Sequence, residues 1–194
     1  MTEIQENSGT VTGTLISPYG HALPDLKVSF LLAQWEKILG PGDFAPGVHI
    51  PGGGRMSLDV CGKSLKQADD FYRKYFPEKK VKAFVCVSWI FNTQFESELP
   101  ESNIANLMRQ VYLFPCRSNG KDGGFFIFGK DSGDISRYPT DNSVRNAMLN
   151  ILDSGRRLRS GGMFILPEHL DRFGEEYYRN NLALPAEMDQ ENAQ

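Results

Sequence analysis

The sequence predicts an α+β domain whose mixed, mostly antiparallel sheet is flanked by helices and contains one parallel β-α-β unit. A glycine-rich turn at residues 52–54 follows a short apolar stretch at 45–50 and precedes a helical pattern at 57–76. The stretch 83–91 is almost continuously apolar, which is typical of a strand covered on both faces. A right-handed crossover would make these two strands parallel neighbours. The other strand-like stretches alternate or are joined by polar loops, as in antiparallel sheets.

The bulk composition indicates one ordinary globular domain. The chain has 194 residues, of which 40% are hydrophobic and 23% charged, and its net charge is −3. This charge gives no general reason to expect a nucleic-acid partner, and no apolar run approaches the ~20 residues that a membrane helix needs. We therefore expect neither partner, and a single domain at residues 10–182. A flexible tail is expected at 1–9 and a disordered, acidic and amide-rich tail at 183–194.

The sequence carries no sign of secretion or of a metal site. Its first residues are polar and acidic, unlike a secretory signal. The cysteines Cys61, Cys86 and Cys116 lie far apart and form no Cys-x-x-Cys pair. We therefore expect reduced thiols in a cytoplasmic protein, without metal ligands.

The N-terminal part is predicted to form an antiparallel hairpin. Residues 10–16 alternate apolar and polar side chains, and so do residues 27–32. The intervening residues 17–25 hold two prolines and a glycine, which favour a turn. Residues 34–39 are predicted to form one or two helical turns before the strand at 45–50.

The helix at 57–76 has the clearest local pattern in the chain. Ser57 is a good N-cap residue, Asp59 suits the positive end of the helix dipole, and Pro77 ends the helix. Apolar side chains recur at spacings of three and four, which makes one stripe: Leu58, Cys61, Leu65, Ala68, Tyr72 and Tyr75.

The second half is predicted to alternate helices and strands. Ser102 caps a helix that ends near Gln110, and Thr140 caps a third helix with Gly155 as its C′ residue. Pro167 begins a final helix. Strands are expected at residues 111–117, 124–130 and 158–166, with a hairpin loop at 118–123.

The glycine-rich turn has the chemistry of an anion site. Gly52, Gly53 and Gly54 lack a Cβ, so their backbone N–H groups can approach a ligand closely. The following helix N-terminus and the Arg55 guanidinium add positive potential. We expect these residues, together with Met56, to cradle a phosphate group. The alternative is a wide loop that only turns the chain into the helix.

Several short motifs occur in a specific order along residues 35–166. They are Trp35 with Leu39-Gly40-Pro41-Gly42-Asp43, then His49-Ile50-Pro51-Gly52-Gly53, then Ser64, Ala68, Phe71 and Tyr75-Phe76-Pro77-Glu78, then Cys86-Val87-Ser88-Trp89-Ile90, then Leu99-Pro100-Glu101-Ser102-Asn103-Ile104, and finally Thr140, Arg145 and Gly155. In order and spacing they resemble the GNAT-like C-terminal domain of bacterial acyltransferase-domain proteins, a family related to the GNAT N-acetyltransferases. The sequence departs from the family pattern at Val87, where a histidine is often found, and at Asn92-Thr93, where Asp-Pro is often found.

The resemblance implies a fold in which the strands at 45–50 and 83–91 splay apart. The pantetheine of acetyl-CoA or another acyl-CoA would lie in the gap, with its pyrophosphate on the amides of the glycine-rich turn. Members of the family also carry an N-terminal acyltransferase-associated domain, which we expect a separate chain or a longer protein to supply.

Four side chains are candidates for the chemistry of such a site. His49 is a candidate general base, because imidazole titrates near neutral pH. Ser88 would donate to a thioester carbonyl or a leaving thiolate, and Trp89 and Asn103 would contact the substrate. Each has a structural alternative. His49 would be a hydrogen-bonded structural histidine and Ser88 a buried serine. Trp89 would be a core residue, and Asn103 the first residue of a helix that Ser102 caps.

Two functional hypotheses follow. The first is an acyl-CoA-dependent N-acyltransferase, in which a small-molecule or peptide amine attacks the thioester directly. The second is a catalytically silent domain of the same fold that binds a small ligand or a partner protein. The basic cluster Arg156, Arg157 and Arg159 is interpreted as a solvated face.

Overall fold

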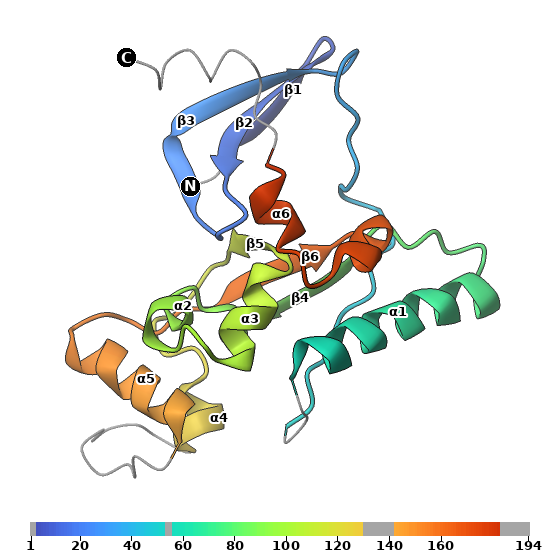
Figure 1. Ribbon diagram of the computed structural model, residues 1–194. Helices are drawn as coiled ribbons and strands as arrows, with labels where there is room; N and C mark the ends of the chain where they lie inside the picture. Colours follow the sequence, from blue (N-terminus) through green and yellow to red (C-terminus); the bar gives the residue numbers. More distant parts are fainter. Residues whose placement is uncertain (1–2, 53–55, 130–141, 183–194) are drawn as a thin grey trace.

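The computed structural model describes residues 3–52, 56–129 and 142–182, and these residues form two antiparallel three-stranded sheets (Figure 1). The first has the order β1-β2-β3, with β1 at Ile4–Asn7, β2 at Thr10–Ile16 and β3 at Ala22–Leu31. The second has the order β4-β6-β5, with β4 at Phe84–Ser88, β5 at Tyr112–Pro115 and β6 at Gly161–Ile165. The first sheet stands at one end of the molecule and the second lies centrally (Figure 1).

Six α-helices and two 3-10 helices surround the second sheet in the described part of the chain. The α-helices are α1 (Leu58–Tyr75), α2 (Phe95–Glu98), α3 (Asn103–Arg109), α4 (Gly124–Phe128), α5 (Ser143–Asp153) and α6 (Tyr177–Asn180). The 3-10 helices are Trp89–Phe91 and Pro167–Arg172.

The predicted parallel unit is present, and it makes the second sheet mixed. Phe44 and Gly47 form parallel bridges to Val81 and Val85. The Val85 N–H donates to the Pro46 carbonyl at 3.0 Å, and the Val85 carbonyl accepts from the Val48 N–H at 2.7 Å. The other edge of β4 pairs with β6. This confirms that the stretches at 45–50 and 83–91 are parallel neighbours joined by a helix, although only β4 forms a regular strand.

Helix α1 follows its predicted pattern except at Tyr75, the last residue of the predicted stripe, which is exposed because the helix ends there. It covers Leu58–Tyr75 with Ser57 at the N-cap, but the Ser57 side chain makes no capping hydrogen bond. The apolar stripe packs inward through Leu65, which is buried. Pro77 lies just beyond the C-cap residue Phe76, as expected of a residue that cannot continue a helix.

The structure corrects the prediction of one continuous sheet and a loose N-terminus. Residues Ile4–Asn7 form β1, which pairs with β2, where a flexible tail at 1–9 was expected. The β1–β3 sheet is joined to the second sheet through a bridge between Tyr19 and Leu113. A turn covers residues 32–34, and residues 35–39 follow it without the predicted helical turns.

Two further corrections lie in the second half. The stretch 124–130 was predicted as a strand, but Gly124–Phe128 is helix α4, because Gly123 at φ 81° turns the backbone out of an extended course. The cap of the third helix is Asn142, whose side chain accepts from the Val144 and Arg145 N–H groups, whereas the predicted cap Thr140 lies outside the described residues.

Other predicted helix ends are confirmed. The Ser102 hydroxyl accepts from the Ala105 N–H at 3.1 Å and caps α3. Gly155 follows α5 with φ 75°, a left-handed conformation that glycine adopts without strain.

The core lies between the second sheet and helices α1, α2, α3 and α5. Its largest fully buried apolar side chains are Phe84, Phe91, Phe95, Met108, Leu113, Met148, Ile151 and Ile165. Gly161 in β6 permits this packing, since a Cβ there would lie 2.1 Å from the Phe91 carbonyl oxygen. The close packing of β6 against Phe91 therefore depends on a glycine at this position.

Candidate functional site

A cleft of about 950 Å³ opens where the parallel segments part. No described backbone hydrogen bond joins the two segments beyond Val48 and Val85, so residues 49–52 and 86–89 diverge and line its walls. The further lining residues are Met56, Ile104, Asp122, Gly123, Phe126, Ile127 and Ser160. The cleft thus lies where the predicted splay places it.

Beyond Val85, the edge of β4 that faces the cleft has no neighbouring strand among the described residues. Val85 directs its N–H and carbonyl toward the parallel segment. Because backbone groups alternate between the two edges of a strand, Val87 directs its own N–H toward the same edge. The parallel segment has already diverged there, so the Val87 N–H faces the cleft and is able to donate to a ligand. The Val87 side chain is 64% exposed.

The structure brings three of the four candidate side chains to the cleft. His49 is exposed and lines it. Ser88 also lines it, while its Oγ accepts from the Ile90 N–H at 3.3 Å, so the hydroxyl has a capping role in the structure. Trp89 lines the cleft and stacks on Phe126, with 6.4 Å between ring centroids.

Asn103 is not among the residues that line the cleft. It is the exposed first residue of α3, and its neighbour Ile104 reaches the cleft instead. The geometry therefore favours the alternative interpretation of Asn103 as a helix-start residue.

Part of the predicted phosphate loop borders the cleft. Gly52 and Met56 line it at the N-terminal end of α1, whereas Gly53, Gly54 and Arg55 lie outside the described residues. A Cβ built on Gly52 meets no heavy atom within 4 Å, so space for a ligand exists beside its backbone.

Asp122 is a cleft residue that sequence analysis missed. Its carboxylate accepts from the Ser118 hydroxyl, from the Ser160 hydroxyl at 3.0 Å, and from the Asn119 N–H at 3.1 Å. Burial alone raises the pKa of Asp122, but these hydrogen bonds outweigh burial and lower the pKa below its usual value. The carboxylate is therefore charged at neutral pH, and it places a negative charge at the wall of the cleft.

A second, apolar pocket of about 240 Å³ adjoins the cleft. The two share residues 48–51 and Met56. The pocket continues between α1, α3 and β6, and its further lining residues are Val60, Cys61, Ser64, Leu65, Phe91, Leu107, Val111 and Met163. The apolar pocket therefore lies beside the same segment, residues 48–51, that lines the cleft.

The three cysteines are free, and burial raises the pKa of the Cys61, Cys86 and Cys116 thiols. This disfavours the nucleophilic thiolate form. Among the described residues there is no cluster of His, Cys, Asp and Glu that could hold a metal ion. No helix in this described part has the length and apolar character needed to cross a membrane.

Comparison with protein families identifies the fold. A model described as "GNAT-like C-terminal domain" matches residues 7–164. The chain belongs to this family. Members of the GNAT-like C-terminal domain family thus include this sequence despite its departures at Val87 and Asn92.

Solved structures agree with the family at the level of fold. An acyltransferase in complex with decanoyl-CoA is similar at a TM-score of 0.56 and 21% identity, and the match covers 84% of this chain and 46% of that one. The same coverage, with 19% identity and TM-scores of 0.56, is found for an acyltransferase with decanoyl-CoA and teicoplanin, and for one with CoA and 10C-teicoplanin. The chain therefore spans about half the length of these structures. No curated protein matches.

Proposed function

We propose that this GNAT-like C-terminal domain binds a medium-chain acyl-CoA and transfers the acyl group to an amine. The observation that carries the proposal is the cleft between the diverging segments at Val48 and Val85, which opens beside the glycine-rich turn. It offers a free strand edge for the amides of pantetheine and a helix N-terminus for the pyrophosphate. The similar acyltransferase structures hold decanoyl-CoA or CoA, which supports an acyl-CoA as the ligand here.

The proposed chemistry is direct transfer. The amine nitrogen attacks the thioester carbonyl carbon and an N–C bond forms, then the C–S bond breaks and coenzyme A leaves as a thiolate, which takes up a proton from solvent. His49 accepts the proton that the amine loses, while the Val87 N–H donates to the developing oxyanion. The charged Asp122 carboxylate attracts a cationic amine acceptor to the cleft. Trp89 and Ser88 form the wall along which the acceptor would lie.

The apolar pocket beside His49 argues for an acyl chain longer than acetyl. If a methylene group takes roughly the 30 Å³ that a water molecule occupies in the liquid, the 240 Å³ pocket holds about eight such groups. Burying each one contributes about 0.8 kcal/mol. An octanoyl chain would fill the pocket, whereas an acetyl group would leave most of it without contacts.

Thermal unfolding with and without ligand tests this proposal. At concentrations about a hundredfold above the dissociation constant, octanoyl-CoA should stabilise the fold by roughly 2.7 kcal/mol, which is on the order of 5–10 °C in Tm for a domain of this size. Acetyl-CoA at the same concentration should give a smaller shift, because it leaves the apolar pocket unfilled. If neither compound moves the melt at millimolar concentration, the proposal fails.

Matched variants locate the effect. Gly52→Asp places a carboxylate where phosphate is expected and should abolish the shift, whereas Gly52→Ala adds a neutral methyl group into open space and should largely keep it.

Ser64→Phe fills the apolar pocket and should remove the preference for octanoyl-CoA over acetyl-CoA. Gln67→Phe, on the same helix but outside the pocket lining, should leave that preference unchanged. An equal loss in both variants of either pair would place the ligand elsewhere.

A catalytically silent binding domain is the second candidate. The position where the family often carries a histidine is the exposed Val87, so β4 supplies no titratable side chain there. This candidate shares the cleft and the ligand but predicts that bound octanoyl-CoA releases no thiol in the presence of any amine.

A further inference from the structure

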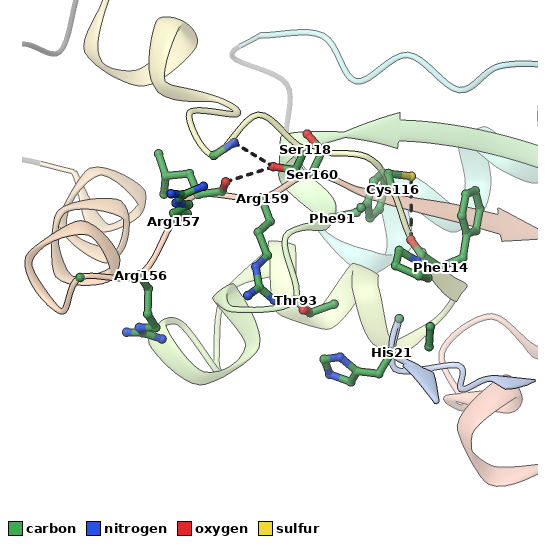
Figure 2. A pocket seen from close by; sticks show the side chains of 17 residues that line it. His21, Phe91, Thr93, Phe114, Cys116, Ser118, Arg156, Arg157, Arg159 and Ser160 are labelled. Atoms are coloured by element: carbon green, nitrogen blue, oxygen red, sulfur yellow. Dashed lines mark hydrogen bonds between the residues drawn. The ribbon is translucent and has the colours of Figure 1, made fainter. Parts of the chain in front are cut away.

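A second large hollow, of about 610 Å³, lies at the start of β6, where Gly161 lines it (Figure 2). It is bounded by the β2–β3 turn at His21, by the end of β5 at Phe114 and Pro115, and by the segment that follows α5. This segment supplies Arg156 and two further arginines. The arginines predicted to form a solvated face therefore surround a hollow, because residues distant in sequence complete its walls.

Hydrogen bonds and a parallel bridge fix the backbone of the segment that carries the arginines. Its Arg156 N–H donates to the Ile151 carbonyl at 3.1 Å, and Leu158 forms a parallel bridge to Lys121. The Ser118 hydroxyl donates to the Leu158 carbonyl at 3.2 Å. The backbone that presents the guanidinium groups is therefore fixed by hydrogen bonds rather than left as an open loop.

The side chains are also positioned. Gly120, at φ 85°, leaves room for the Arg157 stem, because a Cβ there would lie 3.2 Å from the Arg157 Cδ. Figure 2 shows that the Arg159 side chain extends toward Thr93, across the hollow from its own backbone. Both arginines are exposed and line the same open hollow.

Only one arginine of the hollow has a carboxylate ion-pair partner among the described residues. The Arg156 guanidinium forms an ion pair with Glu98 at 2.6 Å and donates to the Ser154 hydroxyl at 2.7 Å. In contrast, neither Arg157 nor Arg159 forms an ion pair with any carboxylate of the described residues. The Asp122 carboxylate, which accepts from the Ser118 and Ser160 hydroxyls of the lining, adds one negative charge nearby. The two guanidinium groups of Arg157 and Arg159 therefore leave a net positive charge beside walls that include the apolar side chains of Phe114 and Pro115.

We propose that this hollow is a binding site for a small organic phosphate monoester, separate from the acyl-CoA cleft. A phosphate monoester carries about −1.5 to −2 charges near neutral pH, which matches the two guanidinium groups of Arg157 and Arg159. Guanidinium forks bind phosphate oxygens in pairs. The volume lies within the range of about 300–1,000 Å³ that is usual for small-ligand sites, and the apolar walls accommodate an organic body.

Calorimetric titration with inorganic phosphate at constant ionic strength tests the site. Phosphate should bind at one site per chain and should bind more tightly than acetate, which carries one charge. Arg157→Gln and Arg159→Gln should each weaken phosphate binding by about tenfold or more, since each removes a pair of charge-assisted hydrogen bonds. Each variant's unaltered melt without ligand will show that it is folded.

The matched control is Arg117→Gln, which removes the same charge from an exposed arginine after β5 that does not line the hollow. It should leave phosphate binding unchanged. The proposal is overturned if phosphate does not bind at about 10 mM, roughly −2.7 kcal/mol of binding free energy, if acetate binds as well as phosphate, or if Arg117→Gln weakens binding as much as the other variants. Phosphate binding that is lost in Gly52→Asp but kept in Arg157→Gln and Arg159→Gln would also overturn it, because the anion would then occupy the cofactor site.

Discussion

His49→Gln should lower the rate of acyl transfer by about 100-fold or more, because a positioned general base contributes roughly 10²–10⁴ in rate. Glutamine keeps a hydrogen-bonding side chain of similar reach but cannot accept a proton near neutral pH. His49 is exposed at the cleft wall, so the substitution disturbs no core packing. The measurement is thiol release from octanoyl-CoA with the best acceptor from a panel of amines.

The matched control is His21→Gln, since His21 lines the other hollow and not the cleft. This control should keep the full rate. The stabilisation by octanoyl-CoA should survive in His49→Gln, which separates a lost base from lost binding. An unchanged rate in His49→Gln would show that the amine loses its proton without this imidazole.

Glu96→Ala should destabilise the folded protein by about 3 kcal/mol or more, because it leaves a buried guanidinium without its partner. Arg179 donates two hydrogen bonds to the Glu96 carboxylate, at 2.8 and 2.6 Å, and thereby ties α6 to α2. The Arg179 side chain is only 5% exposed and the Glu96 side chain 20%. Thermal and denaturant unfolding measure the loss, on the order of 6–12 °C in Tm.

Glu98→Ala is the comparison on the same helix. Glu98 pairs with Arg156, whose side chain is 43% exposed, so water can replace the lost partner. This variant should cost about 1 kcal/mol or less. Equal losses in the two variants would mean that burial of Arg179 does not govern the strength of its ion pair.

The sequence predicted those parts of the fold that have a local signal. The apolar stripe of α1, the Ser102 cap and Gly155 are encoded within a few residues of where they act, and the structure has them all. The parallel pairing of the segments at 45–50 and 83–91 was also predictable, since a β-α-β unit restricts its own topology.

The errors came where tertiary contacts decide. The apolar run at 124–130 suits a strand as well as a helix. Gly123 has a positive φ and no Cβ, which would lie 2.7 Å from the Trp89 ring, so the chain can pass this ring and turn into α4. The separate sheet β1-β2-β3 was not predicted. Its first strand, β1, is mostly polar, so its sequence has no strand pattern that would show β2–β3 pairing with it.

The candidate site also has residues that the sequence predicted and residues that it did not. His49, Gly52, Ser88 and Trp89 lie close in sequence to the glycine turn or on the next strand, and all four line the cleft. Asp122 comes from a distant loop that reaches the cleft only after folding. Arg156, Arg157 and Arg159 are exposed, as the interpretation of a solvated face expected. The hollow that they line could not be predicted, because its opposite walls come from β2–β3 and β5.

Amide NMR during a titration with octanoyl-CoA tests the central claim most directly. If the cleft holds the acyl-CoA, the largest shift changes should fall on His49, Gly52 and residues 85–88, while the amides of β1 and β2 stay unchanged as an internal reference. Shift changes confined to the β1–β3 sheet or to the arginine-lined hollow, or an unchanged spectrum at saturating ligand, would contradict the claim.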